Sequence, residues 1–173
     1  MGPGARAGEY RRWFDYERDS HARVLAALAA VPPDRRSAPE FQRALTLLAH
    51  VVVARRLWLF RLGAAREGPG PGDFFPEDLT LPEVAGRLEA MEAVWTSYLA
   101  GLDDAAVARP FEYRTFEGEW FRLPVADILT QLYGHSLYHR GQIALLLRAG
   151  GFEPATTDFV FWAREKIEEP RGG

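Results

Sequence analysis

Histidines are the residues in this 173-residue chain whose spacing suggests metal chemistry. His135 and His139 lie four positions apart in YGHSLYHRGQIALLLRAGG (133–151), a stretch that otherwise has the composition of a buried helix. Each residue turns an α-helix by about 100°, so these two imidazoles project from the same side. Such a pair can converge on one metal ion, as in helical zinc sites. The alternative is a pair of structural histidines on a crowded core helix.

His50 is the best candidate for a third ligand. It lies in the middle of LTLLAHVVVARRLW (45–58), with apolar neighbours on both sides. Inward-facing histidines from two helices of a bundle meet in its core, where bundle metal sites are built. We therefore predict a metal site formed by His50, His135 and His139. A hydrogen-bonded core histidine is the alternative for His50.

Three further polar residues are candidates for contacting a cofactor or substrate. Gln131 and Gln142 share the helical sector of the histidine pair, whereas His21 lies on an earlier helix. We expect these three residues to border the same cavity, although His21 could equally be exposed or structural. The sequence assigns no general base.

Charged residues near these candidates have simpler interpretations. Asp15, Glu17 and Asp19 are typical of a solvated helix face, although they could also orient a ligand imidazole. Arg140 points about 100° away from His139 around the helix, which favours a structural ion pair over substrate binding.

Composition excludes several classes of site and partner. The chain has no cysteine, so disulfides, iron–sulfur clusters, thiolate zinc sites and cysteine nucleophiles are excluded. A net charge of −3 and the lack of a basic stripe argue against binding to nucleic acid. The longest apolar runs are far too short to span a membrane. With no apolar signal core at the N-terminus, we expect a soluble cytoplasmic protein.

The elements that must position these residues are helices. Apolar periodicity predicts a helix over 9–30 and a second from the capping signal SAPE (37–40) to residue 62. A third starts at the capping signal TLPE (80–83), after a Gly- and Pro-rich loop over 68–78.

The second half of the chain adds a hairpin. Aromatic and β-branched residues over 111–123 flank a turn at Gly118, followed by a long helix over 124–150 and a short one over about 158–168. The sum is an all-α fold, a four-helix bundle with a small β-hairpin before the last long helix and a short C-terminal helix. We expect a single domain over 9–168 after a disordered N-terminus, 1–8.

The motifs together resemble the DinB-like (YfiT/DinB) superfamily, which includes mycothiol- and bacillithiol-dependent S-transferases. The segment GHSLYHRGQI matches the superfamily's H-x-x-x-H-R-x-Q block, and His50 precedes His135 by 85 residues, close to its usual separation. Trp58 eight residues after His50, the EGEW turn and FDYERDSHARVLAAL on the first helix also match in order. His21 stands where the superfamily often has asparagine, and Asp19 where it often has tryptophan.

This resemblance implies a divalent metal, most often zinc or nickel, on the three histidines, and in many members a homodimer. It also implies a small-molecule electrophile and a low-molecular-weight thiol such as bacillithiol or mycothiol as partners, in detoxification or stress response. Two alternatives stay open: a metal-dependent hydrolase using bound hydroxide, and a non-enzymatic metal-binding protein.

Overall fold

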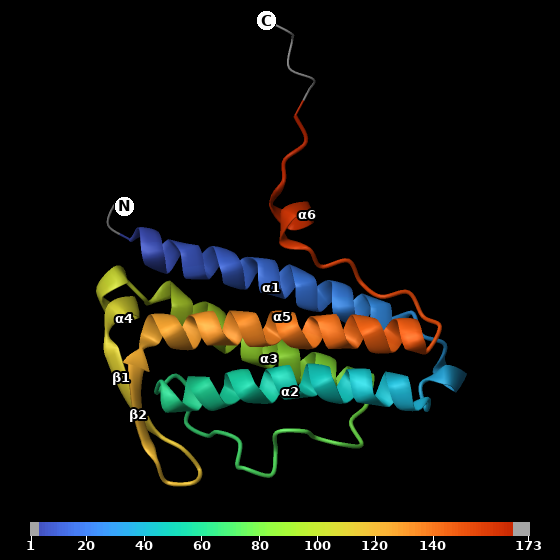
Figure 1. Ribbon diagram of the computed structural model, residues 1–173, viewed down its shortest axis with the longest axis horizontal. Helices are drawn as coiled ribbons and strands as arrows, with labels where there is room; N and C mark the ends of the chain where they lie inside the picture. Colours follow the sequence, from blue (N-terminus) through green and yellow to red (C-terminus); the bar gives the residue numbers. More distant parts are fainter. Residues whose placement is uncertain (1–3, 168–173) are drawn as a thin grey trace, which may run out of the picture.

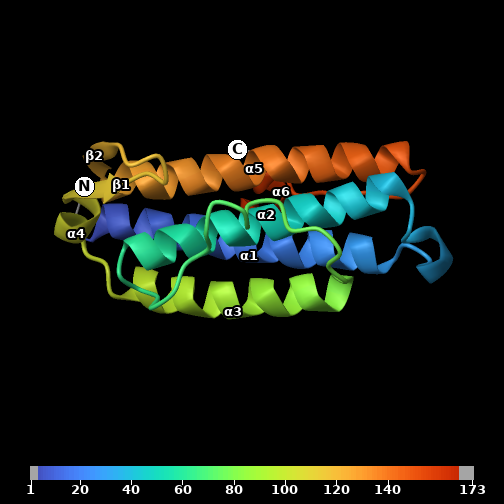
Figure 2. The same ribbon diagram turned by 90° about the horizontal axis from the view of Figure 1, so that it is seen from below.

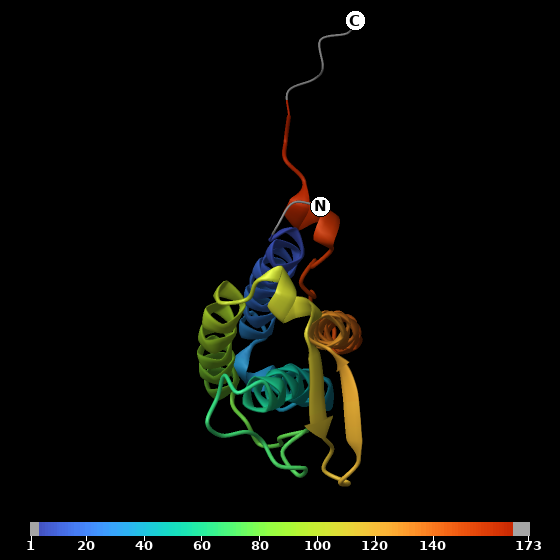
Figure 3. The same cartoon turned by 90° about the vertical axis from the view of Figure 1, so that its left-hand side faces the viewer.

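The computed structural model describes residues 4–167, which form a bundle of four long helices (Figure 1). These are α1 (Ala5–Ala29), α2 (Pro39–Arg61), α3 (Leu81–Ala100) and α5 (Val125–Ala149). Seen end-on, they surround one core in the order α1, α3, α2, α5, so α2 and α5 are neighbours (Figure 3). The predicted all-α bundle is confirmed. In the described range, no helix combines the length and apolarity needed to cross a membrane.

Shorter elements connect the long helices. A 3-10 turn, η1 (Pro33–Arg35), joins α1 to α2, and α4 (Asp104–Ala108) follows α3. Strands β1 (Pro110–Arg114) and β2 (Trp120–Pro124) pair antiparallel, with Phe111 opposite Leu123. The turn between them has Gly118 at φ 93°, a left-handed conformation that suits glycine. The predicted hairpin is confirmed, whereas α4 was not predicted.

The N-terminus differs from the prediction. Helix α1 starts at Ala5, so the disorder predicted for 1–8 is wrong for residues 5–8, while residues 1–3 lie outside the described range. Asp104 on α4 accepts hydrogen bonds from the backbone N–H groups of Gly4, at 3.0 Å, and Ala7, at 2.9 Å. Because the first N–H groups of a helix have no partner within it, this carboxylate stabilises the first turn from outside.

Two other helix ends also test the sequence signals. Thr80 and Glu83 form the predicted capping box at the start of α3. The box predicted for Ser37 and Glu40 is wrong, because α2 begins one residue later, with Ala38 at the N-cap position and no side-chain cap. This start places Pro39 at the first helical position, where its missing N–H costs nothing.

The last helix is shorter than predicted. Helix α6 (Phe159–Ala163) ends four residues before the end of the described range, and predicted position 168 lies outside that range. The segment before α6 is tied to the bundle by the hydroxyl of Tyr16, which donates to the backbone carbonyl of Thr157. Tyr16 also packs edge-on against Phe159 and Trp162 of α6.

A polar layer divides the core at the middle of the bundle. One apolar cluster fills the end near the hairpin and includes Phe14, Trp95 and Leu129. A second fills the opposite end and includes Leu28, Leu48 and Leu147. The buried polar side chains lie where the two clusters adjoin, and all but Arg55 fall between them along the chain. They are Glu17, Ser20, His21, His50, Arg55, Ser136, His139 and Arg140.

Part of this layer is ionic. Arg55 of α2 donates to Glu17 of α1 across the core, and the other Glu17 oxygen lies 4.0 Å from Arg140 of α5. Arg140 in turn donates to the hydroxyls of Tyr16, at 2.9 Å, and Ser136, at 3.2 Å. The solvated position predicted for Glu17 is therefore wrong. The structural ion pair predicted for Arg140 is observed.

We predict that replacing Glu17 strongly destabilises the bundle. The substitution Glu17→Gln leaves two buried guanidinium groups without the carboxylate they share, and we expect the free energy of unfolding in urea to fall by about 3–5 kcal/mol. The matched control is Glu112→Gln, which removes an exposed hairpin pair with Arg122 and should cost less than about 1 kcal/mol. Equal losses in the two variants would contradict a structural role for the buried pair.

Candidate metal centre

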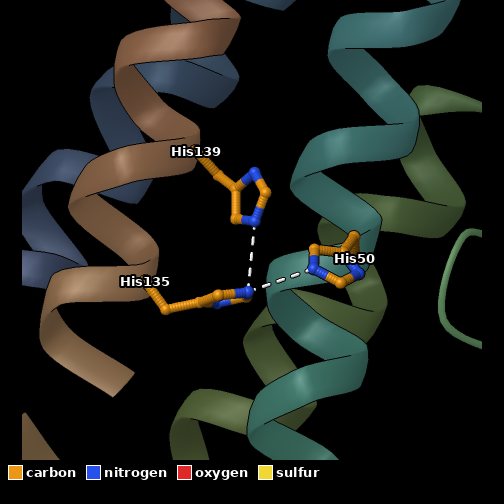
Figure 4. Close-up of side chains that lie close together, drawn as sticks. All are labelled: His50, His135 and His139. Carbon is orange, nitrogen blue, oxygen red and sulfur yellow. Dashed lines mark hydrogen bonds between the residues drawn. The ribbon is translucent and has the colours of Figure 1, made fainter. Parts of the chain in front are cut away.

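Three histidines meet between α2 and α5 at the level of the polar layer (Figure 4). The Nε2 atom of His135 lies 3.1 Å from Nε2 of His50 and 3.1 Å from Nε2 of His139. One ring nitrogen from each lies within 4.8 Å of the others. Two adjacent turns of α5 and one turn of α2 thus bring together the three residues singled out from the sequence.

Hydrogen bonds fix the protonation of two of these rings. His50 Nδ1 lies 2.7 Å from the backbone carbonyl of Phe74, and His139 Nδ1 lies 2.7 Å from Oε1 of Gln142. Both oxygens only accept hydrogen bonds, so each Nδ1 carries the proton and donates it. In a neutral imidazole the opposite nitrogen, Nε2, then carries no proton and has a free lone pair.

The three Nε2 atoms therefore lie close together with too few protons for each contact between them to be a hydrogen bond. His135 Nε2 can donate a proton to one of its two neighbours but not to both. A divalent cation resolves this conflict, because neutral imidazole nitrogens bind metals at about 2.0–2.1 Å, which separates ligand nitrogens in a tetrahedral site by about 3.3 Å. The observed contacts of 3.1 Å are close to that separation. The residues present fit a divalent ion.

An aromatic ring covers one ligand from the outside. Phe75 stacks on His50 with ring centroids 4.2 Å apart and an interplanar angle of 2°. Phe75 belongs to the connection between α2 and α3, which crosses the outer side of α2 (Figures 1 and 2). This loop thus supplies both the carbonyl that orients His50 and the ring that shields it.

Burial disfavours the charged form of two of the three imidazoles, those of His135 and His50. Burial lowers the pKa of His135 to about 4, with additional repulsion from His139, His50 and Arg55. Burial also lowers the pKa of His50, although its hydrogen bond to Phe74 opposes this shift. Metal binding requires neutral imidazole, so at neutral pH these two ligands need lose no proton before binding.

The other predicted contact residues lie in different places. His21 is fully buried and bonded on both sides, 2.8 Å from Glu92 and 3.1 Å from Ser136, so it belongs to the structural part of the layer. Gln142 contacts His139 directly and orients a ligand. Gln131 is exposed on α5 and makes no hydrogen bond to the three histidines within residues 4–167. A role for these three in cofactor binding stays a prediction.

The structure agrees with the resemblance found in the sequence. It is a helical bundle with a hairpin before its last long helix, and three histidines lie between α2 and α5. The sequence model of the DinB family matches residues 5–171. The chain belongs to the DinB family. The match spans every helix and strand of this DinB-family chain. No curated protein and no solved structure shows significant similarity to it.

We predict that this DinB-family protein binds one divalent ion per chain, and that His135→Ala abolishes stoichiometric binding. The measurement is elemental analysis and a zinc or nickel titration of protein purified without a histidine tag. Gln142→Leu should weaken metal affinity about 10–100-fold, because it removes the acceptor that orients His139. His21→Asn, a folded-state control, should keep full stoichiometry. If His21→Asn alone loses the metal, the assignment of His50, His135 and His139 as ligands is wrong.

We also predict a pH dependence of the metal-free protein. The pKa of His135 is lower in the folded state than its ordinary value of about 6.5. The unfolded chain therefore binds more protons between about pH 6.5 and 4, so this contribution to stability is complete above pH 6.5 and is lost as pH falls towards 4. Urea titrations of the metal-free protein and of His135→Gln at several pH values measure it. The variant should show a shallower decline, and parallel curves would contradict the prediction.

Proposed function

We propose that this protein is a metal-dependent S-transferase, which joins a low-molecular-weight thiol to a small electrophile. The observation that carries this proposal is the all-imidazole donor set. Structural zinc sites are closed by four protein ligands, whereas three ligands leave a position for a reactant. A divalent ion held by His50, His135 and His139 would supply acidity, since a coordinating thiol is deprotonated outright and coordinated water reaches a pKa of about 7.

The residues around the histidines favour a thiol over water as the nucleophile. Hydrolytic zinc sites of the H-E-x-x-H type use a carboxylate as general base beside the ligands. Among residues 4–167, the group that could hold a metal contains histidines alone and no carboxylate. A thiol would need no such base, because a divalent ion bound to the histidines would supply the acidity that releases its proton to solvent. The thiolate sulfur would then form a bond to the electrophilic carbon as the bond from that carbon to its leaving group breaks.

The protein's own part in this reaction is positioning. Phe74 and Gln142 hold His50 and His139 in the tautomer that offers Nε2 to a metal. Phe75 covers His50 and limits the approach of water on that side. The chain has no cysteine, so the nucleophilic sulfur must come from a free thiol. Zinc and nickel both suit three imidazoles, and we propose one of them as the resident ion.

The remaining expectations about this protein stay predictions. They are the homodimer, the nature of the thiol, for example bacillithiol or mycothiol, a place in detoxification or stress response, and the absence of nucleic-acid partners. The cytoplasm is the proposed location, since thiols are kept reduced there.

We predict that the metal-loaded protein accelerates the loss of a thiol together with monochlorobimane. Fluorescence of the adduct measures the rate, with cysteine, bacillithiol and mycothiol as thiols. His135→Ala should reduce turnover to the uncatalysed level, and addition of a chelator should do the same. The control Glu112→Gln, which changes an exposed hairpin residue outside the histidine group, should keep turnover.

Two other outcomes would favour the alternatives. Turnover of an activated ester that needs metal but no thiol would replace the proposal with a metal-dependent hydrolase. If neither reaction occurs and chelation lowers the melting temperature sharply, the site is structural, and the proposed activity is wrong.

A further inference from the structure

A groove lies beside the metal centre on the α2–α5 face. It has a volume of about 410 Å³, and its lining includes His139 and Gln142, so it is continuous with the ligand set. Cavities that hold small molecules commonly measure about 300–1,000 Å³. A larger hollow of about 500 Å³ lies between α1 and α3, but no histidine lines it. The groove on the α2–α5 face is therefore the place for a molecule that reacts at the metal centre.

The groove is mostly apolar. Leu47 of α2 and Leu145 and Leu146 of α5 line it, together with the rings of Phe75 and Tyr138. Leu145 and Tyr138 are about two-thirds exposed, so the lining presents apolar surface to solvent. Such a surface favours a hydrocarbon chain or ring over a sugar or another strongly hydrated group.

One positive charge lies within this apolar lining. Arg43 is the lining residue that carries a formal charge, and no carboxylate lines the groove. Its guanidinium lies over the ring of Phe75, 5.6 Å from the centroid, and Phe75 in turn stacks on His50. One ring, that of Phe75, thus contacts both this cation and a candidate metal ligand. Within the described part of the chain, Arg43 forms no salt bridge.

We infer that the groove binds an apolar molecule that carries a carboxylate, with the carboxylate at Arg43 and the apolar body along Leu47, Leu145 and Leu146. This inference rests on the proposed function and names the class of its electrophilic substrate. A guanidinium that forms no salt bridge within residues 4–167 is matched to a planar carboxylate, with which it forms paired hydrogen bonds. The reactive end of the substrate then lies towards His139 and Gln142.

Binding of octanoate, 1-octanol and octylamine by calorimetry tests this inference, in both the metal-loaded and the metal-free protein. Octanoate should bind most tightly, and Arg43→Gln should weaken it about fivefold, the effect of losing one partly exposed ion pair. The matched control is Arg56→Gln, which removes an exposed charge of the same helix outside the groove lining and should leave binding unchanged.

A second variant keeps the test independent of Arg43. Leu145→Glu replaces an exposed side chain and places a carboxylate in the lining, so it should weaken octanoate and strengthen octylamine. Equal binding of octanoate and octylamine to the unmodified protein would overturn the inference. So would octanoate binding that disappears with the metal but is unchanged in Arg43→Gln, since the carboxylate would then bind the ion.

The two proposals fail separately. If the protein binds no metal and turns over no thiol, the S-transferase proposal is wrong, but Arg43-dependent octanoate binding to the metal-free protein still supports the groove. If thiol turnover is observed while octanoate does not bind, the inference about substrate class is wrong and the activity stands.

Discussion

The polar layer at the middle of the bundle is the constraint on which the rest of this structure depends. Buried charges and lone pairs are costly unless each finds a partner, and a layer of them in a helical core weakens the apolar packing it interrupts. The bundle accommodates the layer by placing an apolar cluster on either side of it. Each cluster draws side chains from several helices, so the helices are held in register at the level where the polar groups must meet.

Helix α5 carries both halves of this layer. His135 and His139 face α2, whereas Ser136 and Arg140, each one residue further along, face the side chains of α1. A step of one residue rotates the side chain by about 100°, so a single helical segment serves two neighbours at once. The ligand set and the ionic network therefore share one rigid support. A shift of α5 that disturbed the Glu17 pairing would also move two of the three imidazoles.

Local patterns in the sequence predicted the four long helices, the hairpin and the ligand candidates. The period of apolar residues identified the four long helices, and the spacing of His135 and His139 identified a shared face. Interactions between distant segments were not predictable in this way. The capping of α1 by Asp104, about 100 residues away, and the stacking of Phe75 on His50 depend on how loops return to the bundle. The Gly- and Pro-rich sequence of 68–78 predicted only a loop and did not indicate that this loop orients a candidate metal ligand.

Charge was the least predictable property. Glu17 stands in a run of charged residues on α1 that is typical of a solvated face, yet it is buried because Arg55 and Arg140 approach it from two other helices. No single-helix pattern contains that information. His21 was ambiguous for the same reason, since Glu92 of α3 and Ser136 of α5 decide its environment.

The same charges bear on what the centre binds. Glu17, Arg55 and Arg140 together carry one net positive charge, and Arg55 is close enough to His135 to contribute to its lowered pKa. A divalent ion on three neutral imidazoles would raise the local charge to three, with Arg43 adding a fourth at the groove. Uncompensated positive charge in a partly buried site favours anionic ligands. The thiolate proposed at the histidines and the carboxylate proposed at Arg43 would both meet that requirement, whereas a neutral or cationic pair of reactants would leave it unmet.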